Sequence, residues 1–506
     1  MIPAYNGARH GGRLAGLICF LQAMLSSGES GVPTPSPIAL TGGPNRIAEL
    51  LQTLIRFDTT NPPGNERECL AYIHRLLTDA GCDAQLVGRS PDRPNLIAKL
   101  SGRGDAPPLL LQGHVDVVPA DPREWRHPPF EGRIVDGYVW GRGALDMKGG
   151  IAMMLTAFLR AKAEALPLPG DVVLALVSDE ERGGEYGARY LVESQGHLFQ
   201  GIRYAIGEFG GFSFPLGNRR FYPIMVTEKQ ICVLRASVRA PGGHGALASK
   251  GGAMAQLARA LLRLENRRMP VHVTPATRRM LRAIVSNLAF PQGALLRLLL
   301  NPPLTGLTLK LLGGRRRIFE PLLRNTATAT VVRGGEGFNV VPGEISLGLD
   351  CRLLPGYGPD DLISELRPIL GGAVELEVVY HDPSPEEPDL GLFDTLADVL
   401  RQADPKAVPV PMLLPASTDG RFFSRLGIQT YGFLPMALPP DFEFAKTIHG
   451  PDERIPIAAL TFGSDGIYKL LRRFGEGQAG PGPQSRRIVA VDGPLSGAKP
   501  GNSRPD

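Results

Sequence analysis

Short apolar segments alternate with longer helical segments through the first half of the chain. Residues 109–112, 172–177 and 204–206 are short apolar runs, which predicts strands buried in the interior. Residues 150–165 and 188–194 have the length and apolar spacing of helices. Strands that alternate with helices in this way form a mixed, largely parallel sheet with helices on both faces. The chain is therefore predicted to contain a domain of the α/β class.

The middle of the chain has a different pattern. Apolar and polar residues alternate in several runs there, which is the period of a strand with one face buried and one exposed. We expect a smaller, inserted α+β domain of ferredoxin-like type, with four strands and two helices. The strands are expected at 230–240, 328–332, 344–352 and 374–380, and the helices at 253–264 and 360–370.

The length of the chain and its Gly and Pro content predict how the domains are arranged. A chain of 506 residues exceeds what one hydrophobic core usually supports, so we expect two domains with terminal extensions. Residues 475–506 contain seven Gly and five Pro without apolar periodicity, which is typical of a disordered tail. The expected parts are a flexible or targeting extension at 1–43, the larger domain at 44–226 and 383–474, the inserted domain at 227–382 with a helical insert at 266–323, and the tail at 475–506.

Charge and cysteine content argue against several classes of partner. The net charge of +5 is small, and no basic stripe interleaved with aromatic residues indicates a nucleic-acid surface. The five cysteines are scattered and fit core positions better than a disulfide framework or a thiolate zinc site. The apolar segment 14–25 is too short to cross a bilayer and lacks a good cleavage site. We expect a cytoplasmic protein without a nucleic-acid or membrane partner, with export by this segment as the alternative.

Carboxylate and imidazole side chains follow the ends of the predicted strands. Open α/β sheets place their sites at the carboxyl ends of the strands, so these side chains should meet at one edge. Carboxylates that converge repel one another, and a bound dication reverses that repulsion. Imidazole and carboxylate ligands without a thiolate suit zinc, with manganese or cobalt as substitutes. The residues concerned are His114, Asp116, Asp146, Asp179, Glu180, Glu181 and Glu208.

Four separated motifs resemble, in order and spacing, the metallopeptidase superfamily of aminoacylase, carboxypeptidase G and succinyl-diaminopimelate desuccinylase. They are HVDVVP at 114–119, GRGALDMKGG at 141–150, DEE at 179–181 and HGPDE at 449–453. The resemblance extends from about residue 45 to residue 474. It implies a hydrolase with two metal ions that cleaves the amide bond of small peptides or N-acyl amino acids bearing a free carboxylate.

The resemblance also implies a role for each residue of the metal site. The implied zinc ligands are His114 and Glu208 for one ion, Glu181 and His449 for the other, and Asp146 for both. Asp116 would orient His114, and Glu180 would act as the general base. The peptide bond between Asp146 and Met147 is expected to be cis, as in relatives.

Residues of the inserted domain resemble substrate-binding residues of the same superfamily. His244, in the segment APGGHG, resembles the histidine that stabilises the oxyanion in the neighbouring subunit of dimeric relatives, which implies a homodimer through the inserted domain. Arg352, in the segment DCRLLPG, resembles the arginine that binds the substrate carboxylate with a fork that lysine lacks. The further candidates for contacts in the substrate pocket are Asn325, Asn339 and Asp419.

Two other functions stay open at the level of sequence. The long insert at 266–323 resembles that of the larger carboxypeptidase and N-acyl-amino-acid hydrolase branch. An aminopeptidase or dipeptidase with a similar dinuclear site would bind a substrate amine instead, and Arg352 argues against it. A catalytically inactive binding protein would have lost the base or a metal ligand, yet Glu180 and all five ligand positions are present.

Overall fold

The computed structural model describes residues 43–216, 219–247 and 250–476, which all belong to one compact unit. The domain boundaries drawn from the sequence therefore stay predictions. The expected N-terminal extension and C-terminal tail, the apolar segment 14–25 and Cys19 lie outside the described residues, apart from the first residues of the tail and Gly43. The described cysteines are Cys69, Cys82, Cys232 and Cys351, and all four are buried and free, as predicted.

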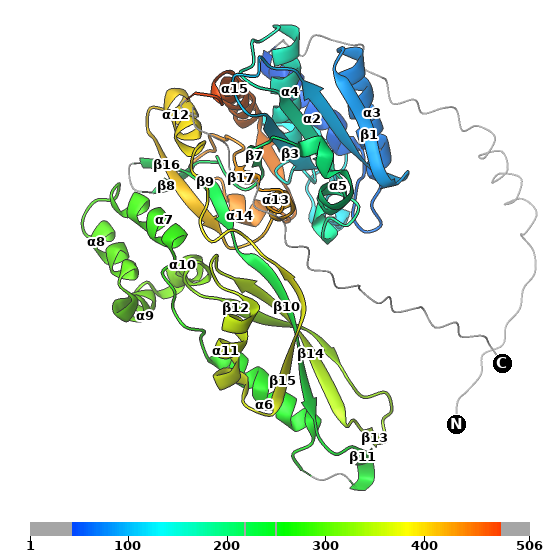
Figure 1. Ribbon diagram of the computed structural model, residues 1–506, viewed down its shortest axis with the longest axis vertical. Helices are drawn as coiled ribbons and strands as arrows, with labels where there is room; N and C mark the ends of the chain where they lie inside the picture. The colour runs from blue at the N-terminus through cyan, green and yellow to red at the C-terminus, as the bar shows by residue number, and fades with distance from the viewer. Residues whose placement is uncertain (1–42, 217–218, 248–249, 477–506) are drawn as a thin grey trace, which may run out of the picture. The chain divides into compact units, whose positions relative to one another are not determined.

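Nine strands form the larger sheet, and the strands at its centre are parallel (Figure 1). They are β1 (Asp83–Ser90), β2 (Arg93–Leu100), β3 (Leu109–His114), β6 (Val172–Val177), β7 (Tyr204–Gly207), β8 (Phe214–Leu216), β9 (Arg219–Glu228), β16 (Ala407–Leu414) and β17 (Gln429–Gly432). The order is β1-β2-β6-β3-β7-β17-β9-β16, with β8 paired to β9. Strand β3 is parallel to β6 and β7, whereas β2 is antiparallel to β1 and β6. The predicted mixed, largely parallel sheet is confirmed.

Helices cover both faces of this sheet, as predicted from the alternation of strands and helices in the sequence. Successive side chains of a strand point to opposite faces, and β6 shows the result. Val172, Leu174 and Leu176 join one core, while the residues between them join another. The first core contains α2 (Gly43–Arg56), α3 (Glu66–Asp79), α4 (Lys148–Ala163), α12 (Phe393–Ala403) and α15 (Ile457–Arg473). The second contains α5 (Ala188–Gln195), η3 (Gly196–Phe199) and α13 (Gly420–Ser424).

The smaller sheet has the four antiparallel strands and two helices expected from the alternating sequence. Its strands are β10 (Gln230–Arg239), β12 (Thr326–Arg333), β14 (Glu344–Leu353) and β15 (Val374–Asp382), in the order β12-β14-β10-β15. Helices α6 (Ala253–Asn266) and α11 (Pro359–Leu370) pack on one face, where Leu234 and Val238 of β10 are buried. On the other face Arg235 forms an ion pair with Glu377. This one-sided burial explains the period of two in the sequence.

The helical insert packs against the larger sheet, although it lies within the inserted domain in sequence. It contains α7 (Pro275–Val285), α8 (Gln292–Arg297), η5 (Leu298–Leu300), α9 (Pro302–Leu311) and α10 (Arg316–Leu323). Leu281 and Val285 of α7 share a core with Phe221 of β9 and with Val408 and Val410 of β16. Helix α7 begins at a Thr274 cap, whose hydroxyl accepts from the amide of Thr277. None of the described helices is long and apolar enough to cross a membrane.

Candidate metal centre

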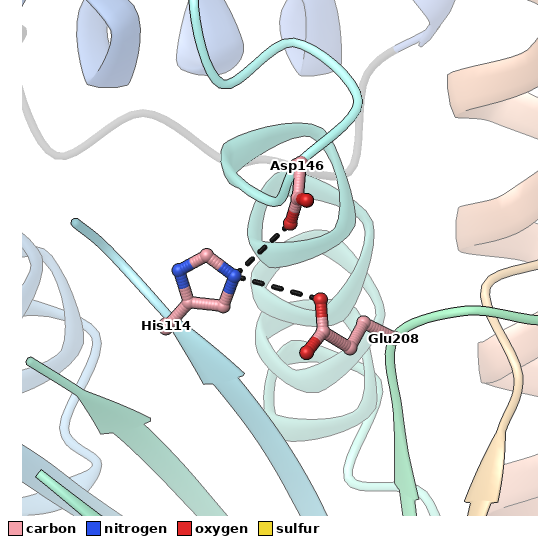
Figure 2. Close-up of side chains that lie close together, drawn as sticks. All are labelled: His114, Asp146 and Glu208. Carbon is pink, nitrogen blue, oxygen red and sulfur yellow. Dashed lines mark hydrogen bonds and ion pairs between the residues drawn. The ribbon is translucent and has the colours of Figure 1, made fainter. Parts of the chain in front are cut away.

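Two groups of side chains that could hold a metal ion share the carboxylate of Asp146. In the first group, His114 Nε2 lies 3.0 Å from Asp146 Oδ1 and 3.5 Å from Glu208 Oε2 (Figure 2). In the second group, His449 Nε2 lies 3.0 Å from Asp146 Oδ2 and 3.3 Å from Glu181 Oε1. Each oxygen of one carboxylate therefore faces a different set of ligands. The ligand atoms of each group lie within 4.8 Å of one another.

Parallel strands deliver three of these side chains to one edge of the sheet. His114 is the last residue of β3, and Glu208 directly follows β7, which is parallel to β3. Glu181 lies on the short 3-10 helix η2 (Glu180–Arg182), which follows β6 on the other side of β3. The carboxyl ends of neighbouring parallel strands meet at the same edge, so the three side chains converge.

A small three-stranded sheet brings the late motif beside Asp146. Strand β18 (Arg454–Pro456) pairs with β5 (Tyr138–Trp140), which also pairs with β4 (Arg133–Val135). His449 precedes β18 and Asp146 follows β5, so this pairing joins two motifs that are about 300 residues apart in the chain. The peptide bond between Asp146 and Met147 is cis, as predicted.

Glu453 holds the turn that carries the shared aspartate, and the sequence analysis gave it no role. Its carboxylate is fully buried and accepts from the backbone amides of Leu145 (2.7 Å) and Asp146 (3.1 Å). Arg142 donates to the same carboxylate at 2.6 Å and balances its charge. Glu453 belongs to the HGPDE motif, but the sequence did not indicate which groups its carboxylate contacts. Those contacts became evident only from the fold.

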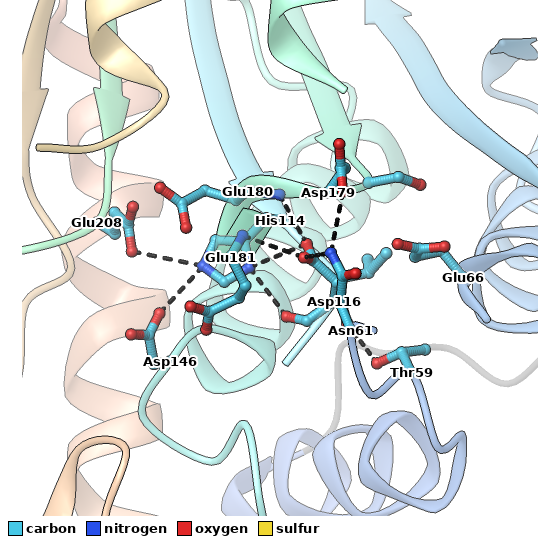
Figure 3. Close-up of polar contacts among 12 residues, drawn as sticks. Thr59, Asn61, Glu66, His114, Asp116, Asp146, Asp179, Glu180, Glu181 and Glu208 are labelled. Atoms are coloured by element: carbon cyan, nitrogen blue, oxygen red, sulfur yellow. Dashed lines mark hydrogen bonds and ion pairs between the residues drawn. The ribbon is translucent and has the colours of Figure 1, made fainter. Parts of the chain in front are cut away.

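Asp116 connects the imidazole of His114 to the turn that carries the acidic pair (Figure 3). The ring atom Nδ1 of His114 lies 2.9 Å from the Asp116 carbonyl oxygen and 3.4 Å from its Oδ1. The buried carboxylate accepts from the amides of Glu180 and Glu181, both at 3.1 Å. Asn61 donates to it as well, at 2.8 Å. The carboxylate of Asp116 thus fixes both the imidazole ring of His114 and the backbone of η2.

Three further polar residues, which the sequence analysis did not single out, support this arrangement. Asn61 also donates to Asp179 Oδ1 at 3.0 Å, and Arg93 forms an ion pair with the same oxygen at 3.0 Å. Arg93 in turn pairs with the buried Glu66. Asp179 has a left-handed backbone with φ of 71°, an uncommon conformation that these contacts hold. A single Asn before two prolines resembles an ordinary turn, so no sequence signal separated Asn61 from a loop residue.

The electrostatics of the cluster favour a bound cation. Burial raises the pKa of Glu208 to about 8, and the charge of Asp146 adds to the shift. Burial and the nearby Glu208 raise the pKa of Glu180 well above its usual range. Among the residues that the structure describes, none donates a hydrogen bond to the buried Glu181 Oε1. Imidazole and carboxylate side chains gathered this closely fit a divalent metal ion in both groups.

Comparison with known proteins places this geometry in a family. The family model described as "Peptidase family M20/M25/M40" matches residues 110–473, well over half of the chain. The chain belongs to this family. M20 enzymes are metal-dependent, and this M20 chain is a metallohydrolase that acts on amide bonds.

Individual M20 relatives match most of the described chain. Human N-fatty-acyl-amino acid synthase/hydrolase PM20D1 is 28% identical over 377 residues, which is 72% of this chain and 74% of the relative. Aminoacylase-1 from Sus scrofa is 26% identical over 445 residues, which is 85% of this chain and 95% of the relative. The M20 family metallo-carboxypeptidase Sso-CP2 from Sulfolobus solfataricus has the same fold, with a TM-score of 0.62, 18% identity, and coverage of 85% of this chain and 99% of that one.

Arg352 lies beside the late loop that contains Asp419. Its guanidinium pairs with Asp350 and donates to the hydroxyl of Ser417 at 2.9 Å. Asp419, two residues further on, is buried, and neither carboxylate oxygen has a hydrogen-bond partner among the described residues. Burial raises the pKa of Asp419 to about 6. The structure thus places the guanidinium of Arg352, on β14, beside the loop that carries this unsatisfied carboxylate.

The other candidates of the inserted domain are not next to the metal ligands within this chain. His244 lies on β11 (Gly243–His244), which pairs with β13 (Val340–Val341), and the Asn339 carbonyl accepts from Gly245 at 2.7 Å. His244 follows the C-terminal end of β10. Strand β10 has ten residues, so that end lies about 33 Å from the end that joins the larger sheet. Asn325 is buried, with its oxygen accepting from the amide of Leu354 and its nitrogen facing Glu365.

Arg421 is a buried residue two positions after Asp419, and the sequence analysis assigned it no role. Its NH1 donates to the Thr418 carbonyl at 2.8 Å and lies 3.9 Å from Glu180 Oε1. Its Nε lies 3.3 Å from Asp382, the last residue of β15. Arg421 therefore joins the acidic turn η2 to the point where the chain leaves the smaller sheet.

We expect the Arg421→Lys variant to retain its metal content, while kcat falls about 10- to 100-fold. Lysine keeps the positive charge but lacks the planar guanidinium that contacts two partners at once. Steady-state kinetics and elemental analysis of the same preparation test this. Loss of metal in parallel with activity would instead assign Arg421 to the integrity of the metal site.

Proposed function

We propose that this chain is a dinuclear zinc hydrolase that cleaves the amide bond of N-acyl amino acids or small peptides with a free carboxylate. The observation that carries the proposal is the pair of ligand groups that share Asp146. Each group offers one imidazole and carboxylate oxygens without a thiolate, which suits zinc, with cobalt or manganese as substitutes. The names of the two relatives, an N-fatty-acyl-amino acid hydrolase and an aminoacylase, support the substrate class.

We propose that the ligands divide as the two groups do. His114 and Glu208 would hold one ion, Glu181 and His449 the other, and Asp146 both. When bound, the two dications supply Lewis-acid chemistry, which polarises the amide carbonyl and lowers the pKa of the attacking water. Asp116 orients the His114 ring through its contact with Nδ1 and so aims Nε2 at the ion.

Glu180 is the proposed general base. It belongs to neither ligand group, yet its neighbour Glu181 does, so its side chain lies beside the reacting centre. The hydrogen bond from its amide to Asp116 fixes its backbone relative to His114. In this role Glu180 takes a proton from the attacking water and returns it to the leaving nitrogen.

Arg352 is the proposed partner of the substrate carboxylate, and Asp419 lines the pocket beside it. The half-buried guanidinium can exchange its intramolecular partner Asp350 for a substrate carboxylate bound by two parallel hydrogen bonds. This arrangement supports a substrate with a free carboxylate over an aminopeptidase substrate with a free amine.

We expect Arg352→Lys to raise KM for N-acyl amino acids about 10- to 100-fold, which is the effect of losing one charged hydrogen bond. The matched control is the corresponding N-acyl amino acid amide, which has no carboxylate. The wild type and the Arg352→Lys variant should hydrolyse that amide equally well. A similar rise in KM for both substrates would count against recognition of the carboxylate by Arg352.

His244 and Asn339 are proposed to serve the site of a second subunit, because they lie at the far end of the smaller sheet in their own chain. Mixing His244→Ala with Glu180→Gln protein should then restore about a quarter of the wild-type activity from two inactive parents, since half of the dimers are mixed and each holds one intact site. Subunit exchange is checked by differential tagging. Exchange without recovered activity would exclude the shared site and leave the metal chemistry intact.

Screening the zinc-loaded protein against a panel of substrates tests the proposed function directly. The panel contains N-acyl amino acids with short and long acyl groups, dipeptides, and amino-acid amides with a free amine and no carboxylate. Turnover of the first two classes supports the proposal. Preference for the amides would support an aminopeptidase, and binding without turnover of any member would support an inactive binding protein.

A further inference from the structure

The positive charge of this protein is concentrated in the helical insert. Residues 266–323 contain ten Lys or Arg residues and a single acidic residue, Glu320. The whole chain has a net charge of only +5, so the remainder is net negative. The proposed metal chemistry uses none of these residues.

Helix α9 buries Leu309 in the core shared with the larger sheet, yet its other buried side chains are threonines and three of its leucines are exposed. The threonines at positions 305 and 308 are buried, and their hydroxyls donate to backbone carbonyls of the insert. Leu304, Leu307 and Leu311 are exposed instead, the last two by 59% and 65%. Their spacing places all three on one face of the helix. A helix that packs on a core normally turns leucines inward, so this face is built to meet something apolar.

Elements that contact α9 also expose aliphatic side chains. Helix α9 contacts both η5 and α10, on which Leu298 and Ile318 are exposed. We call Leu298, Leu304, Leu307, Leu311 and Ile318 the insert patch. Exposed basic side chains stand next to the patch in sequence: Arg297, which directly precedes Leu298, Lys310 on α9, and Arg316 and Arg317 on α10.

We propose that the insert patch docks on an anionic phospholipid surface. Leucine and isoleucine side chains enter the boundary between headgroups and acyl chains, while flanking arginine and lysine side chains bind the lipid phosphates. Such interfacial binding does not require a spanning helix. A nucleic acid would match the charge but not the five exposed aliphatic side chains. A second copy of the patch would match the apolar face, but its like charge would repel.

Vesicle flotation with the full-length, zinc-loaded protein tests the proposal. The wild type should float with phosphatidylcholine vesicles that contain phosphatidylserine, and much less with phosphatidylcholine alone. Binding should weaken as salt is raised, because the phosphate contacts are screened. The Leu304→Ser, Leu307→Ser and Leu311→Ser triple variant should bind at least about tenfold more weakly. A second variant, with Arg297→Gln, Lys310→Gln and Arg316→Gln, should lose the preference for phosphatidylserine.

The matched control replaces three exposed aliphatic residues elsewhere, Leu86→Ser, Ile134→Ser and Leu216→Ser. It should bind vesicles like the wild type, and all variants should hydrolyse a short, soluble substrate equally well. Absence of wild-type binding, or equal loss in the control, would overturn the proposal. If light scattering instead shows a dimer that the leucine variant abolishes, or duplex DNA binds where vesicles do not, the patch has a protein or nucleic-acid partner and the proposal is wrong.

Discussion

The Glu180→Gln variant is expected to retain both metal ions while kcat falls by about two to four orders of magnitude. Glutamine has nearly the same shape but cannot accept the proton of the attacking water at this position. Glu180 belongs to neither of the two ligand groups, so metal affinity should change little. Steady-state kinetics on zinc-loaded protein and elemental analysis of the metal content together measure this outcome.

The matched control for that variant is Glu181→Gln, the adjacent carboxylate on the same turn. Glu181 Oε1 lies 3.3 Å from His449 Nε2 and belongs to the second ligand group. Removing its charge should lower the occupancy of one metal ion, and activity should fall as a consequence. If Glu181→Gln kept both ions and Glu180→Gln lost one, the two roles would have to be exchanged.

Exhaustive chelation is expected to abolish hydrolysis, and zinc, cobalt or manganese should restore it. Without the dications the pKa of the attacking water is not lowered and the carbonyl is not polarised, a loss of several orders of magnitude in rate. The measurement is kcat before chelation, after it, and after each metal is returned. Full activity in protein shown by elemental analysis to be free of metal would refute the proposed function.

A thermal unfolding scan provides a control that does not depend on activity. Glu208 is buried and Glu180 and Glu181 are half-buried near it, and ions that neutralise these carboxylates bind the folded state only. Metal-free protein should therefore unfold at a lower temperature than metal-loaded protein, with a difference that grows with the metal concentration. Loss of activity without any change in unfolding temperature would show that the chelator acts on something other than this cluster.

Several features could be derived from the sequence because they follow from local periodicity. The continuous apolar run at β6 predicted a strand buried on both faces, and the alternation at β10 predicted a strand buried on one face. The positions of His114, Glu181 and Glu208 directly after apolar runs predicted a meeting point, because parallel strands end at the same edge. Each of these inferences needs only a few consecutive residues and one general rule of sheet geometry.

Other features depended on contacts between distant segments, for which the sequence has no local signal. Glu453 reaches Asp146 only because β18 pairs with β5, and Asn61 reaches Asp116 only because Thr60 pairs with Val117. The helical insert is apolar along its sequence, yet which of its faces would pack on β16 and which would stay exposed was not encoded in its spacing. The period of the apolar residues indicates that one face of a helix or strand is apolar. Only the tertiary structure decides whether that face packs on another element or stays exposed.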